Sequence, residues 1–546
     1  MQAFSVVCYT RRMTSARRLA GLALLAAAGL SLALASRAPH DAPPGASALS
    51  APAATALAPG LVTPREPSAA DAVASPVFSP AILRARVRAQ ERILGRDQGT
   101  EDALGHSIPA RQVVLDEGQK PAAVNGNALG RFVPVENEAS LAHFHAALDA
   151  LATTPEEKNK VRILAYGASH TQAGIYSSYL RYYLQSRFGN GGPGFIPVGM
   201  ERGWSQHDVR VRSHGTVVEY VQAKAPLEAP KLPVNSRARR HFGLSGSAAL
   251  AGPNTWLRIE PSNESDPDLT ASQYGLYYAA EPDGAEISVR VDGEAPVRLS
   301  TRASSVEARY HMFERPLGWH DVEVRSLGQG QSRLFGLSIE RMGPGLVLDT
   351  LGIKGTRAAS MLLWDQKLWT EHMQRRAPDL VLLAYGTNET TDRGQPIEEY
   401  AADLARVLGR VRQALPAASC VLVGPGDFPK SEQGNWVTRP RLLEIIAEQR
   451  RLAPEFGCGF WDAYSFMGGD GAMDQWVRAH PRMGAPDHIH LTPRGYVRMG
   501  LMLGDALMRG YDAQHIQSGD RVAVQRGSEP SAAGTSAAAG AGSSSL

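Results

Sequence analysis

The stretch RILAYGASHT, residues 162–171, places a serine in a turn between an apolar strand and a helix. Residues 162–166 form a short apolar run that predicts a strand, and apolar and aromatic residues from 173 to 187 recur at helical spacing. In open α/β sheets, ligands bind at the carboxyl ends of the strands, where we expect Ser169. A backbone N–H at the start of a helix can stabilise an oxyanion there. Ser169 is therefore a candidate nucleophile; the alternative is a serine that only caps the helix.

The alternation of strand and helix returns after residue 345. Strand-like apolar runs occur at 346–351, 380–385, 420–423 and 459–461. Helical patterns occur at about 356–376, 398–415, 439–452 and 493–508. Short apolar strands separated by amphipathic helices predict a parallel sheet covered by helices on both faces.

Residues 201–345 interrupt this alternation of strands and helices. Apolar residues alternate with polar ones at 286–291, Asp292-Gly293 supplies a hairpin turn, and alternation resumes at 297–299. Strand-like runs follow at 322–324 and 334–339. We predict a β-rich domain inserted into an α/β domain that comprises residues 81–200 and 346–515.

The amino-terminal residues 1–36 indicate export. Two arginines precede a 17-residue apolar run, residues 19–35, that closes with small residues, as in a cleaved signal peptide. The alternative is an uncleaved inner-membrane tether, because 17 residues are at the short limit for a span. Met13 is an alternative start to Met1. We expect the protein in the periplasm or cell envelope.

Residues 37–80 are rich in Ala, Pro and Ser and are predicted to be a disordered linker, and 516–546 a disordered tail. Cys420 and Cys458 would remain in the exported chain, each at one of two neighbouring predicted strands. They are either a disulfide or two buried free thiols.

The sequence excludes several protein classes. Lys and Arg total 57 against 54 Asp and Glu, and a net charge of +3 spread along the chain does not fit a nucleic-acid binder. Three cysteines exclude a disulfide scaffold and a four-thiolate zinc site. We expect no cofactor and no metal.

The second candidate motif is Asp487-His488-Ile489-His490. An Asp three residues before His490 can hold one ring nitrogen and leave the other free to take a proton from a hydroxyl. The alternatives are a chance pair and a metal site, which no other cluster of His or Cys completes. A third motif, Tyr385-Gly386-Thr387-Asn388-Glu389, follows a predicted strand, and the Asn388 amide could donate to an oxyanion or belong to an ordinary turn.

Together, the order of these three motifs resembles the SGNH (GDSL-type) hydrolases, a family of serine esterases. The resemblance implies a three-layer α/β/α, flavodoxin-like parallel sheet. It implies Ser169 as nucleophile, His490 as base and Asp487 as its orienting partner. The oxyanion hole would comprise Asn388 and the N–H groups of Ser169 and Gly355.

A narrower resemblance concerns Ser169-His170-Thr171, the segment RFGNGG at 187–192, and Phe460-Trp461-Asp462 with Met467-Gly468-Gly469. These are similar to a branch of bacterial envelope enzymes that act on O-acetyl groups of peptidoglycan or exported polysaccharides. Members can carry an inserted β-sandwich resembling a carbohydrate-binding module, which implies that fold for residues 201–345. The implied activity is hydrolysis of O-acyl, mainly O-acetyl, esters on an O-acylated glycan.

Two other activities fit the same residues. An O-acetyltransferase would pass the acyl group to a sugar instead of water. A non-catalytic carbohydrate-binding envelope protein is suggested by the β-domain and by Ala168, where the family usually has Asp. That Asp is not the triad carboxylate, so its loss should alter the bonding of the turn more than the chemistry. In the β-domain, Trp204, Trp256 and Trp319 could stack on sugars or belong to the core.

Overall fold

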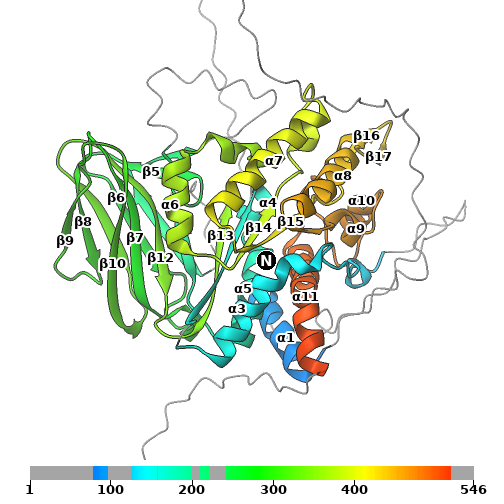
Figure 1. The fold of residues 1–546 in the computed structure, drawn as a ribbon, viewed down its shortest axis with the longest axis horizontal. Helices are drawn as coiled ribbons and strands as arrows, with labels where there is room; N and C mark the ends of the chain where they lie inside the picture. The colour runs from blue at the N-terminus through cyan, green and yellow to red at the C-terminus, as the bar shows by residue number, and fades with distance from the viewer. Residues whose placement is uncertain (1–77, 96–123, 157, 199–207, 221–240, 518–546) are drawn as a thin grey trace, which may run out of the picture. The chain divides into compact units, whose positions relative to one another are not determined.

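The computed structural model describes residues 78–95, 124–156, 158–198, 208–220 and 241–517 (Figure 1). The predictions for the export signal, nearly all of the linker and nearly all of the tail lie outside these residues. Pro80, the last residue of the predicted linker, begins helix α1. No helix in the described ranges is long and apolar enough to cross a membrane.

A five-stranded parallel sheet forms the centre of the α/β domain (Figure 1). Its strands, in spatial order, are β13 (Gly345–Gly352), β1 (Lys160–Gly167), β14 (Leu380–Ala384), β15 (Ser419–Val423) and β18 (Gly459–Trp461). In chain order this is the 2-1-3-4-5 arrangement of flavodoxin-like sheets. The predicted strands are therefore confirmed, and β1 lies between β13 and β14.

Helices cover both faces of this sheet, which confirms the three-layer prediction. Along β1, Ile163 and Ala165 pack into one core, whereas Leu164 and Tyr166 pack into the other. The first core contains residues of α1 (Pro80–Leu94), α3 (Ala142–Thr153), α5 (Ile175–Phe188) and α11 (Pro493–Gln517). The second contains residues of α6 (Gln366–Arg376), α7 (Ile397–Ala414) and α8 (Pro440–Glu455).

The helix predicted at about 356–376 is divided. A 3-10 turn, Ala358–Leu363, comes first, and α6 begins at Gln366. Asp365 separates them because its side chain accepts a hydrogen bond from the backbone N–H of Leu368, at 2.8 Å, and so caps the second helix.

The insertion folds as two antiparallel sheets that share one apolar core. The first sheet has the order β10 (Glu307–Gly318), β7 (Ala271–Ala280), β12 (Ser332–Glu340), β5 (Ser247–Ala251) and β4 (Val217–Tyr220), with β2 (Gly194–Pro197) paired to β12. The second has the order β3 (Val209–His214), β6 (Trp256–Pro261), β11 (Val322–Leu327), β8 (Glu286–Val291) and β9 (Val297–Ser300). Leu276 and Leu337 of the first sheet pack in the same core as Ile259 and Val324 of the second. Strand β2 lies before residue 201, the predicted start of the insertion, so the first sheet includes residues that were predicted to belong to the α/β domain.

Cys420 and Cys458 form a disulfide, with their Cα atoms 4.6 Å apart. The bond joins the neighbouring strands β15 and β18 at their amino ends. Of the two alternatives that the sequence left open, the structure has the disulfide.

A buried charge cluster holds the insertion against the α/β domain. Asp349, fully buried in β13, accepts hydrogen bonds from the Arg376 guanidinium of α6 at 2.5 and 2.8 Å. The backbone N–H of Phe195, in β2, donates to the same carboxylate at 2.8 Å. Arg376 also pairs with Glu340, at the end of β12, which Arg162 contacts at 3.0 Å. Burial alone would raise the pKa of the Glu340 carboxyl, but Arg376 and Arg162 outweigh it and lower the pKa to about 2.

Replacing Arg376 should therefore destabilise the fold strongly. Arg376→Met leaves Asp349 without its cation and Glu340 with Arg162 alone, and breaking a buried pair of this kind costs about 3–5 kcal/mol. Urea denaturation of the full chain should show the loss in the free energy of unfolding. The matched control is Lys367→Met on the same helix, whose exposed pair with Glu371 should be worth less than about 1 kcal/mol. Equal, small effects of the two substitutions would contradict the assignment.

Candidate active site

Ser169 lies where the sequence predicts it, in the turn after β1. Strand β1 ends at Gly167 and helix α4 (Ser169–Gln172) begins two residues later. A Cβ at Gly167 would lie 2.0 Å from Thr171 Oγ1 and 2.8 Å from the carbonyl oxygen of Ala384, so only glycine lets the turn pass the end of β14. This close approach places Ser169 at the carboxyl edge of the sheet.

Ser169, His490 and Asp487 form one chain of hydrogen bonds. His490 Nε2 lies 2.9 Å from Ser169 Oγ, and His490 Nδ1 lies 2.7 Å from Asp487 Oδ2. The carboxylate accepts the Nδ1 hydrogen, so Nε2 is left to accept the serine hydroxyl. The structure thus brings together three predicted residues from opposite ends of the chain.

The Asp487 carboxylate is fixed by its own turn. Its Oδ1 accepts hydrogen bonds from the backbone N–H groups of Ile489 and His490, each at 3.0 Å. Partial burial would raise the pKa of Asp487, but the hydrogen bonds from the His490 ring and these N–H groups outweigh it and hold the pKa below the usual range. The side chains of Asp487 and His490 are 46% and 37% exposed, so the pair lies open to solvent.

Asn388 and Gly355 lie on loops that follow the strands on either side of β1. The Asn388 Nδ2 donates to the carbonyl oxygen of Thr356 at 2.9 Å, which joins its turn to the loop of Gly355. Gly355 has a φ of +72°, a left-handed conformation that favours glycine. An amide group has two hydrogens, so Asn388 keeps one for another acceptor. The part of both residues in an oxyanion hole stays a prediction.

Glu389 holds these two loops together, a role that the sequence motif did not reveal. Its buried carboxyl group accepts the N–H of Ala358 at 2.9 Å and the N–H of Gly386 at 3.1 Å. Its acidic side chain, directly after Asn388, was the available signal, but a partner 31 residues away has no sequence signature.

Ala168 stands at the N-cap of α4, and no side-chain hydrogen bond caps the helix there. The backbone carbonyl of Ala168 still accepts the N–H of Gln172 at 2.9 Å, so the turn forms without a polar side chain at this position. The contact between Ser169 and His490 is made in the same structure.

His170 is a further residue of the site that the sequence did not assign. Tyr496 Oη lies 3.0 Å from His170 Nδ1, within hydrogen-bond distance. Burial and, to a smaller extent, His490, whose ring centroid is 5.2 Å away, lower the pKa of His170 to about 3. His170 therefore stays uncharged beside His490 and Asp487.

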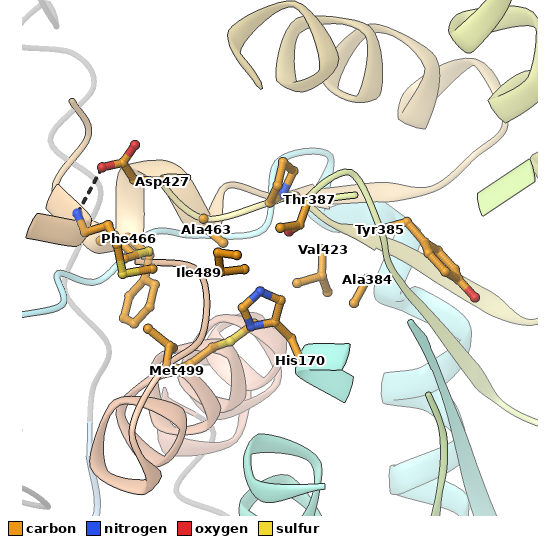
Figure 2. Close-up of a pocket in the computed structure, with 16 residues that line it drawn as sticks. His170, Ala384, Tyr385, Thr387, Val423, Asp427, Ala463, Phe466, Ile489 and Met499 are labelled. Atoms are coloured by element: carbon orange, nitrogen blue, oxygen red, sulfur yellow. Dashed lines mark hydrogen bonds between the residues drawn. The ribbon is translucent and has the colours of Figure 1, made fainter. Parts of the chain in front are cut away.

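An apolar pocket adjoins this site. It encloses about 520 Å³ of empty space, open solvent included, and Figure 2 shows the His170 ring in its middle. The walls include Val423, Ile489 and Met499. His170, Thr387 and Ile489, which all line it, are chain neighbours of Ser169, Asn388 and His490 respectively. The pocket is thus part of the wall of the candidate active site.

A metal site at Asp487-His488-Ile489-His490, the alternative that the sequence left open, can be compared with the atoms that the two histidine rings contact. The two nitrogens of His490 face Ser169 and Asp487, and those of His488 face Pro486 O and Asp474 Oδ1, each at 3.2 Å. Across the described ranges, no group of three or more His, Cys, Asp or Glu side chains could hold a metal ion.

Comparisons with known proteins agree with this fold. Residues 318–498 match the model of the GDSL-like Lipase/Acylhydrolase family, a match that contains Gly355, Asn388, Asp487 and His490. A solved peptidoglycan O-acetylesterase is 23% identical with a TM-score of 0.57, over 69% of this chain and 99% of that one. A family two carbohydrate esterase from Cellvibrio japonicus is 13% identical with a TM-score of 0.22, over 55% of this chain and 98% of that one, too weak a likeness to argue from. No curated protein matches.

The parallel sheet and the family match define a carboxylic ester hydrolase. Within that class, residues 318–498 match the GDSL-type family model, and the α/β domain has the fold of the SGNH hydrolases.

The charge state of His170 can be measured directly. Because its pKa is lowered, the ring stays neutral at every pH above about 3. The ring ¹⁵N resonances of His170, assigned by their loss in His170→Gln, should stay constant from about pH 5 to 8. A titration within that interval would contradict the lowered pKa.

Proposed function

We propose that this protein is a serine esterase that hydrolyses O-acyl esters, chiefly O-acetyl esters, on a cell-envelope or exported polysaccharide such as peptidoglycan. The observation that supports it most is the hydrogen-bonded chain from Ser169 through His490 to Asp487 at an open sheet edge. A serine activated in this way is a nucleophile for acyl transfer.

In the proposed reaction, Ser169 Oγ attacks the acyl carbonyl carbon while His490 Nε2 takes the hydroxyl proton. The N–H groups of Ser169 and Gly355 and the amide of Asn388 would donate to the oxyanion. The sugar oxygen then leaves with the proton from His490, and an acyl-serine remains. Water, deprotonated by His490, attacks this ester and releases the carboxylic acid and free Ser169.

A polymeric substrate fits the exposure of the site. The side chains of Asp487 and His490 are 46% and 37% exposed, so an ester on a long chain could reach Ser169 without threading a tunnel. The structural relative with a TM-score of 0.57 is described as a peptidoglycan O-acetylesterase, which supports the same substrate class.

We also propose that the protein is exported and resides in the periplasm or cell envelope, free or tethered through residues 19–35. The disulfide between Cys420 and Cys458 supports this location, because such bonds persist mainly in oxidising compartments.

The β-sandwich is proposed to bind the glycan, with a structural cap as the alternative. Trp319 is 41% exposed, and its ring nitrogen donates to the carbonyl oxygen of Asp266 at 2.8 Å, which fixes the indole on the surface. Trp256 is half-buried and stacks on His214, and Trp204 lies outside the described residues. Trp319 is thus the best candidate for a sugar platform.

The esterase proposal predicts acetate release from O-acetylated peptidoglycan by the full chain. Ser169→Ala and His490→Ala should abolish release, because the first removes the nucleophile and the second removes the base. Asp487→Asn should lower kcat by about 10⁴-fold, because an amide no longer holds the His490 ring in the tautomer that leaves Nε2 free to accept the serine proton. Ser186→Ala, a serine on α5, is the matched control and should keep the wild-type rate. Other acetylated polysaccharides, assayed in parallel, would rank the substrates. Unchanged rates in folded Ser169→Ala would sink the proposal.

The same incubation separates the two other activities. Acetylated acceptor glycan without free acetate would indicate an O-acetyltransferase that excludes water from the acyl-serine. Neither product, together with no labelling of Ser169 by a fluorophosphonate, would indicate a non-catalytic binding protein.

A second substitution tests the β-sandwich. Trp319→Ala should reduce co-sedimentation with insoluble peptidoglycan while hydrolysis of a small soluble ester stays unchanged, because Trp319 lies on the insertion. Val297→Ala, exposed on the same domain, should leave both unchanged. If Trp319→Ala co-sediments with peptidoglycan as fully as the wild type, the result would favour the alternative that the β-sandwich is a structural cap.

A further inference from the structure

The turn that carries Asp487 and His490 presents its first and last side chains outward and the two between them inward. Asp487 and His490 are exposed, whereas His488 is 7% exposed and Ile489 lines the apolar pocket. His488 has a φ of +55°, in the left-handed region that non-glycine residues seldom adopt. Such a conformation persists only where the surroundings hold it, and it often occurs at functional sites.

Three groups hold the His488 ring. The indole of Trp436 stacks on its face, with ring centroids 3.7 Å apart and planes inclined by 17°. One ring edge faces Asp474 Oδ1 and the other faces the carbonyl oxygen of Pro486, each at 3.2 Å. The ring is therefore fixed on a face and at both nitrogen edges.

The two elements that supply these contacts are themselves tied together. Trp436 lies on the hairpin of β16 (Pro429–Glu432) and β17 (Asn435–Thr438), and Asp474 lies on α10 (Ala472–Arg478). The Asp427 carboxylate accepts the hydroxyl of Thr438, at the end of the hairpin, at 2.8 Å. Its other oxygen accepts the N–H of Met473, in the first turn of α10, at 2.9 Å, the bond dashed in Figure 2. One buried carboxylate thus sets the spacing between Trp436 and Asp474.

We propose that His488 is a positioning residue, clamped between Trp436 and Asp474 so that the turn keeps Asp487 and His490 aligned on Ser169. Neither the motif nor the family match assigns a role to this position or to the hairpin. The inference rests on the proposed esterase function, because alignment matters only if His490 takes a proton from Ser169. His488 touches no reacting atom; it acts through the backbone that it shares with its two neighbours.

The test compares substitutions on the hairpin. Trp436→Ala removes the stacked face and should lower kcat for a small soluble ester by about 10- to 100-fold, the scale of a displacement near 1 Å, with KM within about twofold. Trp436→Phe keeps an aromatic face and should restore most of the rate. Val437→Ala, the neighbouring exposed residue on the same strand, is the matched control and should behave as wild type.

Rates are expressed per folded protein, measured by circular dichroism at the assay temperature, so that loss of folded protein is not counted as loss of alignment. A lower melting temperature with an unchanged rate per folded protein would show a merely structural role and overturn the proposal.

A second measurement does not depend on activity. The hydrogen that His490 Nδ1 shares with Asp487 should give a far-downfield proton resonance, identified by its absence in Asp487→Asn. We expect the resonance in wild type and Trp436→Phe, and its loss or broadening in Trp436→Ala. If the wild type cleaves no ester, the esterase proposal fails, but the spectrum still tests whether Trp436 keeps Asp487 and His490 aligned. An unchanged resonance in Trp436→Ala, or none in wild type, would overturn the proposed positioning role.

Discussion

Asp349 anchors both places where the chain crosses between the two domains of this protein. It is fully buried in β13, where an unpaired carboxylate would be very costly, so its partners are fixed. Those partners are the N–H of Phe195, where the chain enters the insertion's sheet, and Arg376 on α6 of the hydrolase domain. Through Arg376 the same cluster reaches Glu340, where the chain leaves that sheet. Both crossings between the domains are thus tied to one charge in the central sheet.

This arrangement explains how a large insertion can divide a hydrolase domain without disturbing its active site. Strand β13 pairs with β1 along its whole length, from Lys160 opposite Gly345 to Gly167 opposite Gly352. The insertion therefore delivers the returning chain directly beside the strand that ends at Ser169. The loop of Gly355 follows β13, so its position relative to the serine is set by the same pairing.

The sequence predicted the sheet and the candidate triad because both leave local signals: apolar runs of strand length, and polar residues in turns that follow them. It did not reveal Arg376, Glu389 or the contacts of His488. Trp436 and His488 stack at a separation of 52 residues, and nothing in either segment marks the other. The division of the helix at Asp365 was also missed, because an aspartate in an amphipathic pattern becomes a cap only in its three-dimensional setting.

The exposure of Asp487 and His490 makes those unpredicted contacts necessary. An open site admits a polymer, but water then competes for the hydrogen bonds of Asp487 and His490, and exposed ion pairs hold geometry poorly. Orientation must come from residues that are held by contacts within the protein. In this turn they are the buried His488, whose ring stacks on Trp436, and Ile489, which lines the pocket. The four residues of this turn thus separate the two requirements: the outward side chains at its ends can meet a substrate, while the two inward ones between them keep the backbone in place.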